Sequence, residues 1–252
     1  MSNIFDLEGK VAIVTGASTG IGQAIARALA TAGARIVGVS RSSMELTRQQ
    51  IEDSGGAFSA VMADLSAIEP FEHIIEAAAS WGGAVDVLVN NAGVIRRDDP
   101  LNFSERDWDE VINLDLKAVF FLSQAFARRV VAQGSSAKII NIASVLSFQG
   151  GIRVPSYAAA KAGVAGLTRL LACEWAPKGI NVNAIAPGYC VTDATEPLWA
   201  DAARNEAILA RIPAGRWGQP DDIAGAAVFL ASRAADYCHG TILVVDGGWL
   251  AR

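Results

Sequence analysis

Cysteine and histidine are scarce in this chain of 252 residues, which has three cysteines and two histidines. Cys173, Cys190 and Cys238 are far apart and form no Cys-x-x-Cys pair. We therefore expect buried thiols in a reducing compartment, and no disulfide framework. Neither His73 nor His239 stands at the spacing of a zinc site, so the sequence gives little support for metal-assisted chemistry.

Long apolar runs and clusters of positive charge are also missing. Hydrophobic residues make up 52% of the chain, but no run approaches the ~18 residues of a membrane helix. The start has no basic region ahead of an apolar one, as a signal peptide would have. The formal net charge is −5, and the basic pair Arg96-Arg97 is followed at once by Asp98-Asp99. We expect a cytoplasmic protein that binds a small molecule and neither a membrane nor a nucleic acid.

Short apolar strands alternate with amphipathic helices along nearly the whole sequence. Strands are expected near residues 11–15, 35–39, 57–62, 85–89, 138–143, 181–186 and 242–245. The first helix is expected to end at about residue 32, and further helices are expected near 44–53, 70–80, 104–133, 157–175 and 220–231. This alternation predicts an α/β fold: one doubly wound (Rossmann) parallel sheet of about seven strands with helices on both faces. A single domain would cover residues 1–252, and the long irregular stretch at about 189–217 would be a substrate lid.

Three glycines stand directly between the first strand and the first helix. Gly16, Gly20 and Gly22 would let the chain turn tightly and bring backbone N–H groups against a pyrophosphate. The start of the helix adds a favourable field for that anion. The sequence therefore predicts a dinucleotide site.

The end of the second strand carries Ser40-Arg41 and no carboxylate. An acidic residue there would bind the ribose 2′-hydroxyl and would repel a 2′-phosphate. Arg41 could instead pair with a 2′-phosphate, which favours NADP(H). The alternative interpretation is a solvated surface arginine.

A tyrosine and a lysine stand four residues apart on an expected helix. Tyr157 and Lys161 therefore share one face, and we expect the ammonium to lower the pKa of the phenol. Ser144 follows an apolar strand, and strand ends are where α/β enzymes gather their chemistry. A tyrosine placed in this way can exchange a proton with an alcohol or a ketone. Taken alone, the spacing is more often ordinary helix surface, and the glycine loop gives it weight.

Five motifs in order carry a family resemblance: Thr15-Gly-Ala-Ser-Thr-Gly-Ile-Gly22, Asn90-Asn-Ala-Gly93, Ser144, Tyr157-x-x-x-Lys161 and Pro187-Gly188. The chain resembles the short-chain dehydrogenase/reductase family over essentially its whole length. The resemblance implies that Tyr157 is the general acid/base, that Ser144 binds the substrate oxygen and that Lys161 holds the nicotinamide ribose. It also implies contacts to the cofactor phosphates from Gly16, Ser18, Ile21 and Gly22, to the adenine from Asp64 and Leu65, to the ribose from Asn91 and Gly93, and to the carboxamide from Pro187, Gly188, Cys190 and Thr192.

One position departs from the family pattern. An asparagine in the long central helix usually completes a proton relay to the lysine, and Asp115 occupies that place here. An ionised aspartate accepts hydrogen bonds but cannot donate them, so the relay either tolerates a carboxylate or is altered. A catalytically silent nucleotide-binding regulator is the alternative from another class, and the intact Ser144, Tyr157 and Lys161 argue against it. The resemblance further implies a homotetramer.

Longer strings, from Ser147 to Tyr157, Arg211 to Gly218 and Asp246 to Arg252, resemble a bacterial group within the family. That group interconverts a hydroxyl and a ketone on deoxy sugar acids and is generally NAD-linked, so the cofactor is NAD(P) with both forms open. A reductase of a 3-oxoacyl thioester or a polyol is the rival function. A carboxylate substrate needs a cation, and our hypothesis is that Arg153, or one of the Arg96-Arg97 pair, binds it. Each could equally be a structural arginine.

Overall fold

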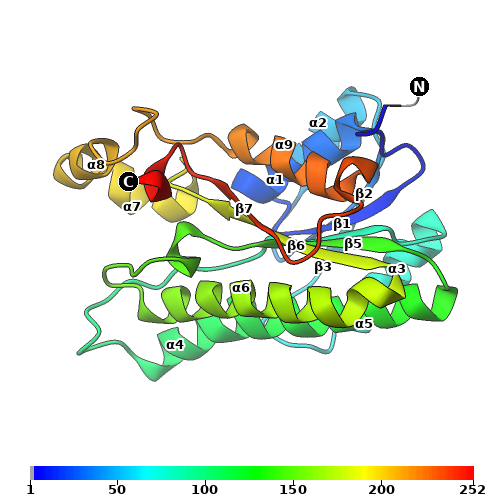
Figure 1. Cartoon of the computed structure of the whole chain (residues 1–252), viewed down its shortest axis with the longest axis horizontal. Coiled ribbons are helices and arrows are strands. Elements are labelled where there is room, and N and C mark those ends of the chain that lie inside the picture. Colours follow the sequence, from blue (N-terminus) through cyan, green and yellow to red (C-terminus); the bar gives the residue numbers. More distant parts are fainter. Residues whose placement is uncertain (1–2) are drawn as a thin grey trace.

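The computed structural model describes residues 3–252, and within them one parallel sheet of seven strands runs through the middle of the molecule (Figure 1). The strands are β1 (Val11–Thr15), β2 (Arg35–Ser40), β3 (Phe58–Met62), β4 (Val87–Asn90), β5 (Ala137–Ile142), β6 (Ile180–Pro187) and β7 (Ile242–Val245). Their order in the sheet is β3-β2-β1-β4-β5-β6-β7, and all neighbouring pairs are parallel. The order therefore reverses between β1 and β4, which is where open α/β sheets bind ligands.

Helices cover both faces of the sheet (Figure 1). One face carries α1 (Gly20–Thr31), α2 (Glu45–Asp53) and α9 (Pro220–Ala231), and the other carries α3 (Phe71–Gly82), α4 (Glu105–Ile112), α5 (Ala118–Gln133) and α6 (Pro155–Trp175). Successive residues of β1 serve the two layers, since Ile13 belongs to one apolar cluster and Val14 to the other. Burial on both faces explains the apolar run of a central strand such as β1, which is buried throughout. The predicted doubly wound sheet is confirmed.

The long helix expected at 104–133 has a wider turn in its middle. It begins after Ser104, whose hydroxyl accepts the Asp107 N–H at 3.1 Å. A π-helical turn, η1 (Asn113–Lys117), then joins α4 to α5. Such turns are rare and are frequent at functional sites, and this one places Asp115 in the interior.

The stretch at 189–217 is less irregular than the sequence suggested. It contains the short helices η4 (Asp193–Thr195), α7 (Glu196–Trp199) and α8 (Ala202–Leu209). Asp201 starts α8 by accepting the Arg204 N–H at 3.0 Å. The irregular stretch expected here is therefore partly helical, because helices of one or two turns leave too few residues for a visible apolar period.

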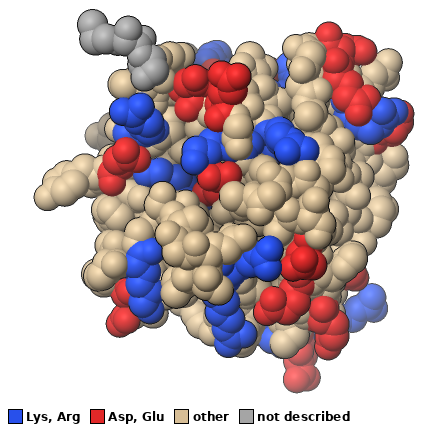
Figure 2. All heavy atoms as spheres, turned by 90° about the vertical axis from the view of Figure 1, so that its right-hand side faces the viewer, with Lys and Arg blue, Asp and Glu red and all other residues tan. Residues whose placement is uncertain are grey.

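The remaining short helices are η2 (Val145–Ser147), η3 (Ala176–Lys178), η5 (Arg233–Ala235) and η6 (Trp249–Ala251). Within residues 3–252, no helix is both long and apolar enough to span a membrane. In the same residues, no three His, Cys, Asp or Glu side chains gather where they could hold a metal ion. Figure 2 shows basic and acidic side chains interspersed over the face that it draws. The expectation that the start has no signal-peptide pattern concerns Met1 and Ser2 among others, and these two residues lie outside the described residues.

Candidate active site

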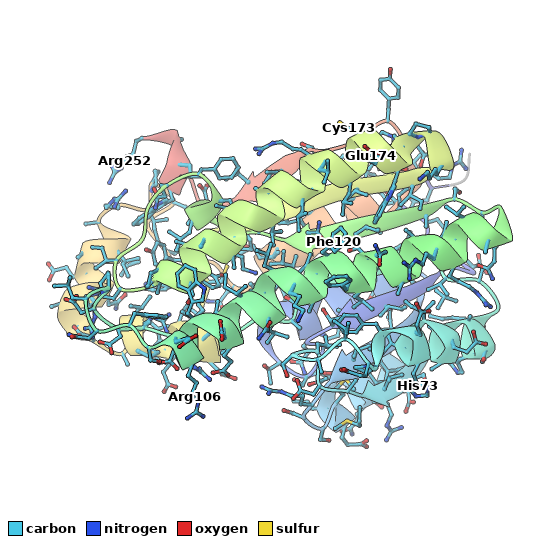
Figure 3. All side chains as sticks on the ribbon, turned by 90° about the horizontal axis from the view of Figure 1, so that it is seen from below. His73, Arg106, Phe120, Cys173, Glu174 and Arg252 are labelled. Atoms are coloured by element: carbon cyan, nitrogen blue, oxygen red, sulfur yellow. The ribbon has the colours of Figure 1, made fainter. Side chains whose placement is uncertain are left out.

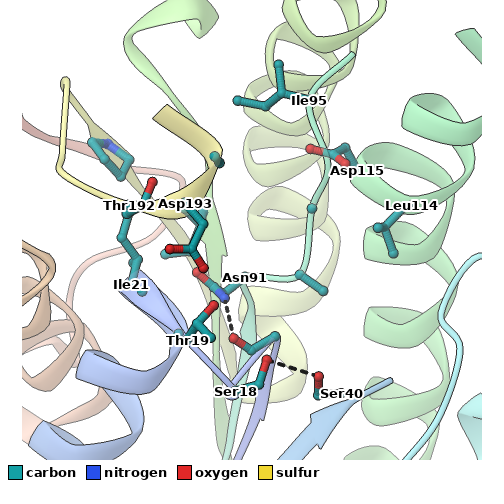
Figure 4. Close-up of a pocket in the computed structure, with 18 of the residues that line it drawn as sticks. Ser18, Thr19, Ile21, Ser40, Asn91, Ile95, Leu114, Asp115, Thr192 and Asp193 are labelled. Atoms are coloured by element: carbon teal, nitrogen blue, oxygen red, sulfur yellow. Dashed lines mark hydrogen bonds between the residues drawn. The ribbon is translucent and has the colours of Figure 1, made fainter. Parts of the chain in front are cut away.

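A cavity of about 360 Å³ opens where the strand order reverses (Figure 4). It brings together most of the residues that the sequence singled out, from the glycine loop to the segment after β6. The predicted site residues in its lining are Gly16, Ser18, Gly20, Ile21, Gly22, Ser40, Arg41, Leu65, Asn91, Gly93, Asp115, Ser144, Tyr157, Lys161, Pro187, Gly188, Cys190 and Thr192. Within residues 3–252, the lining leaves out Asp64, Arg97 and Arg153.

The glycine loop is held against the end of β4. The Asn91 side-chain amide donates to the Thr15 carbonyl at 2.9 Å. It also donates to the Gly16 carbonyl at 3.3 Å (Figure 4). Gly16 has a φ of 67°, and a Cβ there would lie 2.8 Å from the Asn91 Nδ2 atom. A Cβ on Gly22 would collide with the Gly16 carbonyl oxygen. Only glycine fits this close approach, and the loop and the start of α1 line the cavity, where their N–H groups could hold a pyrophosphate.

Polar side chains gather at the end of β2. The Ser40 hydroxyl donates to the Ser18 hydroxyl at 3.2 Å and accepts the Ser42 N–H at 3.1 Å. Arg41 is largely exposed, and its Nη1 lies 3.8 Å from an Asp64 carboxylate oxygen. A hydrogen bond from the Ser66 N–H, with a smaller effect of Arg41, lowers the pKa of Asp64. Asp64 thus faces Arg41 at the rim and not the interior of the cavity.

Ser144 and Lys161 meet at the other end of the cavity. Lys161 is buried, and its Nζ donates to the Ile142 carbonyl at 2.9 Å and lies 5.4 Å from the centre of the Tyr157 ring. Ser144 starts the turn after β5, where its hydroxyl accepts the Leu146 N–H at 3.1 Å. The α6 helix thereby places Tyr157 and Lys161 beside the strand end that carries Ser144.

The pKa of Tyr157 lies above its usual value in this structure. Burial raises the pKa most, and the nearby Asp115 raises it further. Lys161, the Ser144 hydroxyl and Arg97 each lower the pKa but do not outweigh those two effects. Lys161 thus lowers the pKa of Tyr157 as expected, but burial and the Asp115 carboxylate together outweigh it, so the net direction in this structure is upward.

Asp115 is fully buried next to Lys161. One of its carboxylate oxygens accepts the Val94 N–H at 2.8 Å, and the other lies 3.3 Å from the Lys161 Nζ. Burial raises the pKa of the Asp115 carboxyl against the pull of Lys161. Burial lowers the pKa of Lys161, but Asp115 and Tyr157 more than offset this, so that the lysine stays charged.

The arginines proposed for the substrate have different surroundings. Arg97 is half-buried and donates to the Ala194 carbonyl at 2.9 Å; burial lowers its pKa, and its charge acts on Tyr157. Arg153 is exposed, 3.8 Å from Asp98, and has a φ of 63°. Arg96, on the loop after β4, forms an ion pair with Glu110 of α4, with 2.6 Å between Nη2 and the carboxylate oxygen. Of these three arginines, Arg97 is the one whose charge reaches the Tyr157 hydroxyl.

Sequence reasoning missed part of the lining, above all Thr19, Asp193, Ala194 and Thr195. The Thr195 hydroxyl donates to the Cys190 carbonyl at 2.6 Å and so fixes the segment after β6. Thr192 followed three residues later by Thr195 is a helix-start pattern that could have pointed to η4.

Comparison with known proteins fits this geometry. The family model described as enoyl-(acyl carrier protein) reductase, a short-chain dehydrogenase model, matches residues 16–250. The chain belongs to the short-chain dehydrogenase/reductase family. The resemblance expected from the five motifs is confirmed, and the protein is an NAD(P)-dependent oxidoreductase.

Individual relatives are similar over their full length. The 2-dehydro-3-deoxy-D-gluconate 5-dehydrogenase of Escherichia coli (strain K12) is 57% identical over 98% of each chain. A solved structure from Agrobacterium tumefaciens, named provisionally as a 2-deoxy-D-gluconate 3-dehydrogenase and holding NADP, is 61% identical with a TM-score of 0.94 over 100% of each chain. A gluconate 5-dehydrogenase from Burkholderia cenocepacia J2315, solved with NADP and tartrate, is 40% identical with a TM-score of 0.93 over 99% of this chain and 98% of that one.

Proposed function

We propose that this enzyme interconverts a secondary hydroxyl and a ketone on a deoxy sugar acid of the 2-dehydro-3-deoxy-D-gluconate type. The observation that carries the proposal is the meeting of Ser144, Tyr157 and Lys161 at one end of a cavity whose other end is the glycine loop. The Escherichia coli relative, 57% identical, supports the substrate class. The 2-deoxy-D-gluconate type of substrate stays within the proposal, since a relative with 61% identity bears that name.

The residues of the chain divide the reaction between them. The bound nicotinamide cofactor accepts or supplies the hydride. Tyr157 gives its proton to the ketone oxygen in reduction and takes the hydroxyl proton in oxidation. Ser144 donates a hydrogen bond to the same oxygen, and Lys161 places a positive charge beside the tyrosine. The glycine loop and the start of α1 bind the pyrophosphate, and the segment from Pro187 to Thr192 faces the nicotinamide end.

The rim at the end of β2 suits both forms of the cofactor, with NADP(H) favoured. Ser40, Arg41 and Ser42 line the cavity together, and hydroxyl and guanidinium donors are what a 2′-phosphate needs. Asp64 lies 3.8 Å from Arg41 and could bind a ribose hydroxyl when no phosphate is present. Two relatives were solved with NADP, which supports this assignment.

The substrate carboxylate is assigned to Arg97. Its charge acts on Tyr157, and its contact with Ala194 joins it to the segment 189–217, which we propose as the lid. Arg153 is engaged by Asp98 on the rim and is a weaker candidate.

The proposed assembly is a homotetramer, and the proposed location is the cytoplasm. The tetramer is supported by an apolar groove on the outer face of the helical layer shown in Figure 3. The groove is lined by Ile112, Leu116, Lys117, Phe120, Phe121, Gly163, Gly166 and Leu167.

A substrate panel tests the proposed function. The purified protein is mixed with NADPH or NADH and with keto forms of deoxy sugar acids, neutral polyols and 3-oxoacyl thioesters, and the absorbance of the reduced cofactor is followed. We expect the highest kcat/KM on a deoxy sugar acid. Faster turnover of a thioester or a polyol would favour the rival reductase, and tight cofactor binding without any turnover would favour the regulator.

A further inference from the structure

The carboxylate of Asp115 is the one charged group of η1 that the protein buries completely. The oxygen that faces Lys161 accepts no hydrogen bond from residues 3–252 and lies 3.3 Å from the ammonium. Asp115 lines the cavity, where Figure 4 shows it beside the loop that leads to Ile95. A Cβ on Gly93 would lie 2.7 Å from the same oxygen, so this glycine gives the carboxylate its room.

An asparagine in this place would have a different effect on the lysine. It has the same shape and could still accept the Val94 N–H, but it would then turn its NH2 group, a donor, toward the Lys161 ammonium. The ionised aspartate, whose charge Lys161 and the Val94 N–H favour against burial, instead places a negative charge there. A buried charge acts over several ångströms in a medium of low dielectric constant. The negative charge of Asp115 therefore offsets the positive charge of Lys161 at the Tyr157 hydroxyl, whereas a lone Lys161 ammonium would favour the phenolate.

We propose that Asp115 is a positioning residue that neutralises Lys161 and so keeps the Tyr157 hydroxyl protonated at neutral pH. The site is thereby poised to deliver a proton to a ketone oxygen, which makes reduction the direction it favours kinetically. In that step the ketone carbon gains a hydride and the ketone oxygen gains the Tyr157 proton, which leaves a tyrosinate that solvent must reprotonate. The proposal rests on the proposed function for its direction, but the protonation state of Tyr157 is independent of any substrate.

The other charges around the tyrosine do not replace this effect. Tyr157 faces Lys161 on its own helix, Asp115 on η1 and Arg97 on the loop after β4. Arg97 in turn faces Arg204 and Tyr189 from the lid. Of these neighbours, Asp115 alone raises the pKa of Tyr157, and burial acts in the same direction.

Tyrosinate absorbance tests the proposal without cofactor or substrate. Absorbance is followed as the pH is raised, and each tyrosine that ionises gives a step in the titration curve. The chain has three tyrosines, so the step that is lost in Tyr157→Phe belongs to this residue. We expect the Tyr157 step to move to lower pH in Asp115→Asn, while circular dichroism shows that the protein stays folded. Asp109→Asn is the matched control, since it removes an exposed carboxylate six residues earlier and leaves the step unchanged.

The pH profile of kcat/KM supplies the second readout. Oxidation requires the ionised tyrosine, so its acidic limb is expected to move to lower pH in Asp115→Asn. Well below the midpoint we expect oxidation to rise by about threefold or more, because each pH unit of movement is tenfold in rate. The high-pH limb of reduction is expected to move in the same direction.

A Tyr157 step that stays in place or moves to higher pH in Asp115→Asn would overturn the proposal, whatever the substrate panel shows. If the asparagine variant does not fold, Asp115→Ser removes the same charge and is held to the same outcome. A purely structural role would lower stability and kcat together without moving either pH limb, and that result would also count against the proposal.

Discussion

Two arginines expected to bind the substrate carboxylate lie in different surroundings. Arg97 is half-buried with its charge acting on Tyr157, whereas Arg153 is exposed and paired with Asp98. A half-buried guanidinium gains more from a carboxylate than an exposed one, because water screens it less.

We therefore predict that Arg97→Ala lowers kcat/KM for a sugar acid by about 10- to 100-fold, the usual value of a charge-assisted hydrogen bond. Turnover of a neutral keto sugar should change far less. Arg153→Ala is the matched control and should leave both substrates within about threefold of the parent. Steady-state kinetics on the acid and the neutral substrate measure this, and equal losses on both would remove Arg97 from the carboxylate site.

Arg41 is the residue expected to determine the preference between NADPH and NADH. It lies at the end of β2 beside Ser40 and Ser42 and is 3.8 Å from Asp64. Arg41→Ser should weaken NADPH binding by about tenfold and leave NADH binding nearly unchanged, since only the 2′-phosphate loses a partner. Quenching of protein fluorescence measures both affinities. Equal weakening of the two cofactors would show that Arg41 does not read the phosphate.

At the scale of elements, a chain of buried side chains joins the strands that carry the site to the helices behind them. Asn90 on β4 donates to Ser123 on α5 at 2.9 Å and to Asn141 on β5 at 2.8 Å. Asn141 donates in turn to Thr168 on α6 at 3.0 Å. Since Asn91 and Ser144 follow β4 and β5, and Tyr157 stands on α6, this network fixes the elements of the site relative to one another.

Removing the centre of the network should cost stability. Asn141→Ala leaves the Asn90 amide and the Thr168 hydroxyl each short of a partner, and we expect a loss of about 2–4 kcal/mol in the free energy of unfolding. Chemical denaturation measures it. Asn102→Ala, at an exposed position, is the control and should change stability by less than about 0.5 kcal/mol. A loss at Asn141 no larger than that of the control would show that the network is not needed for stability.

The elements also show what the sequence could and could not predict. The strands were predictable because most of them are short apolar runs, as in β1, which is buried throughout. In β6, Asn181 and Asn183 interrupt the apolar run, although the whole strand is buried. The π turn at Asn113 to Lys117 was not, since its residues continue the helical pattern and only the extra-wide turn sets them apart. The partner of Arg153 was not predictable either, since Asp98 is distant in sequence and reaches it only through the fold. The place of Asp115 near Lys161 was expected from the family resemblance, but its complete burial was not.

At the scale of the whole molecule, the outer face of α4, η1, α5 and α6 offers an apolar groove to a second copy. Phe120, Phe121 and Leu167 line it, and they are only partly buried within the described residues 3–252. Figure 3 shows Phe120 on this outer layer. The same layer carries Tyr157 and Lys161 on α6 and Asp115 on η1, so the proposed contact between copies and the geometry of the site would depend on the same helices.

Phe120→Arg tests whether this groove is the interface. A charge in the groove should split the proposed tetramer into smaller species, because a buried arginine without a partner is costly at an apolar contact. Light scattering after size exclusion measures the mass. Val131→Arg adds the same charge at an exposed position of α5 outside the groove, and it should leave the assembly intact. Because the helices behind the groove hold the acid/base pair, we expect kcat to fall along with the mass in Phe120→Arg. An unchanged mass in that variant, or a monomeric parent, would place the contact elsewhere or remove it, and the helices would then have to hold the site without help from a second copy.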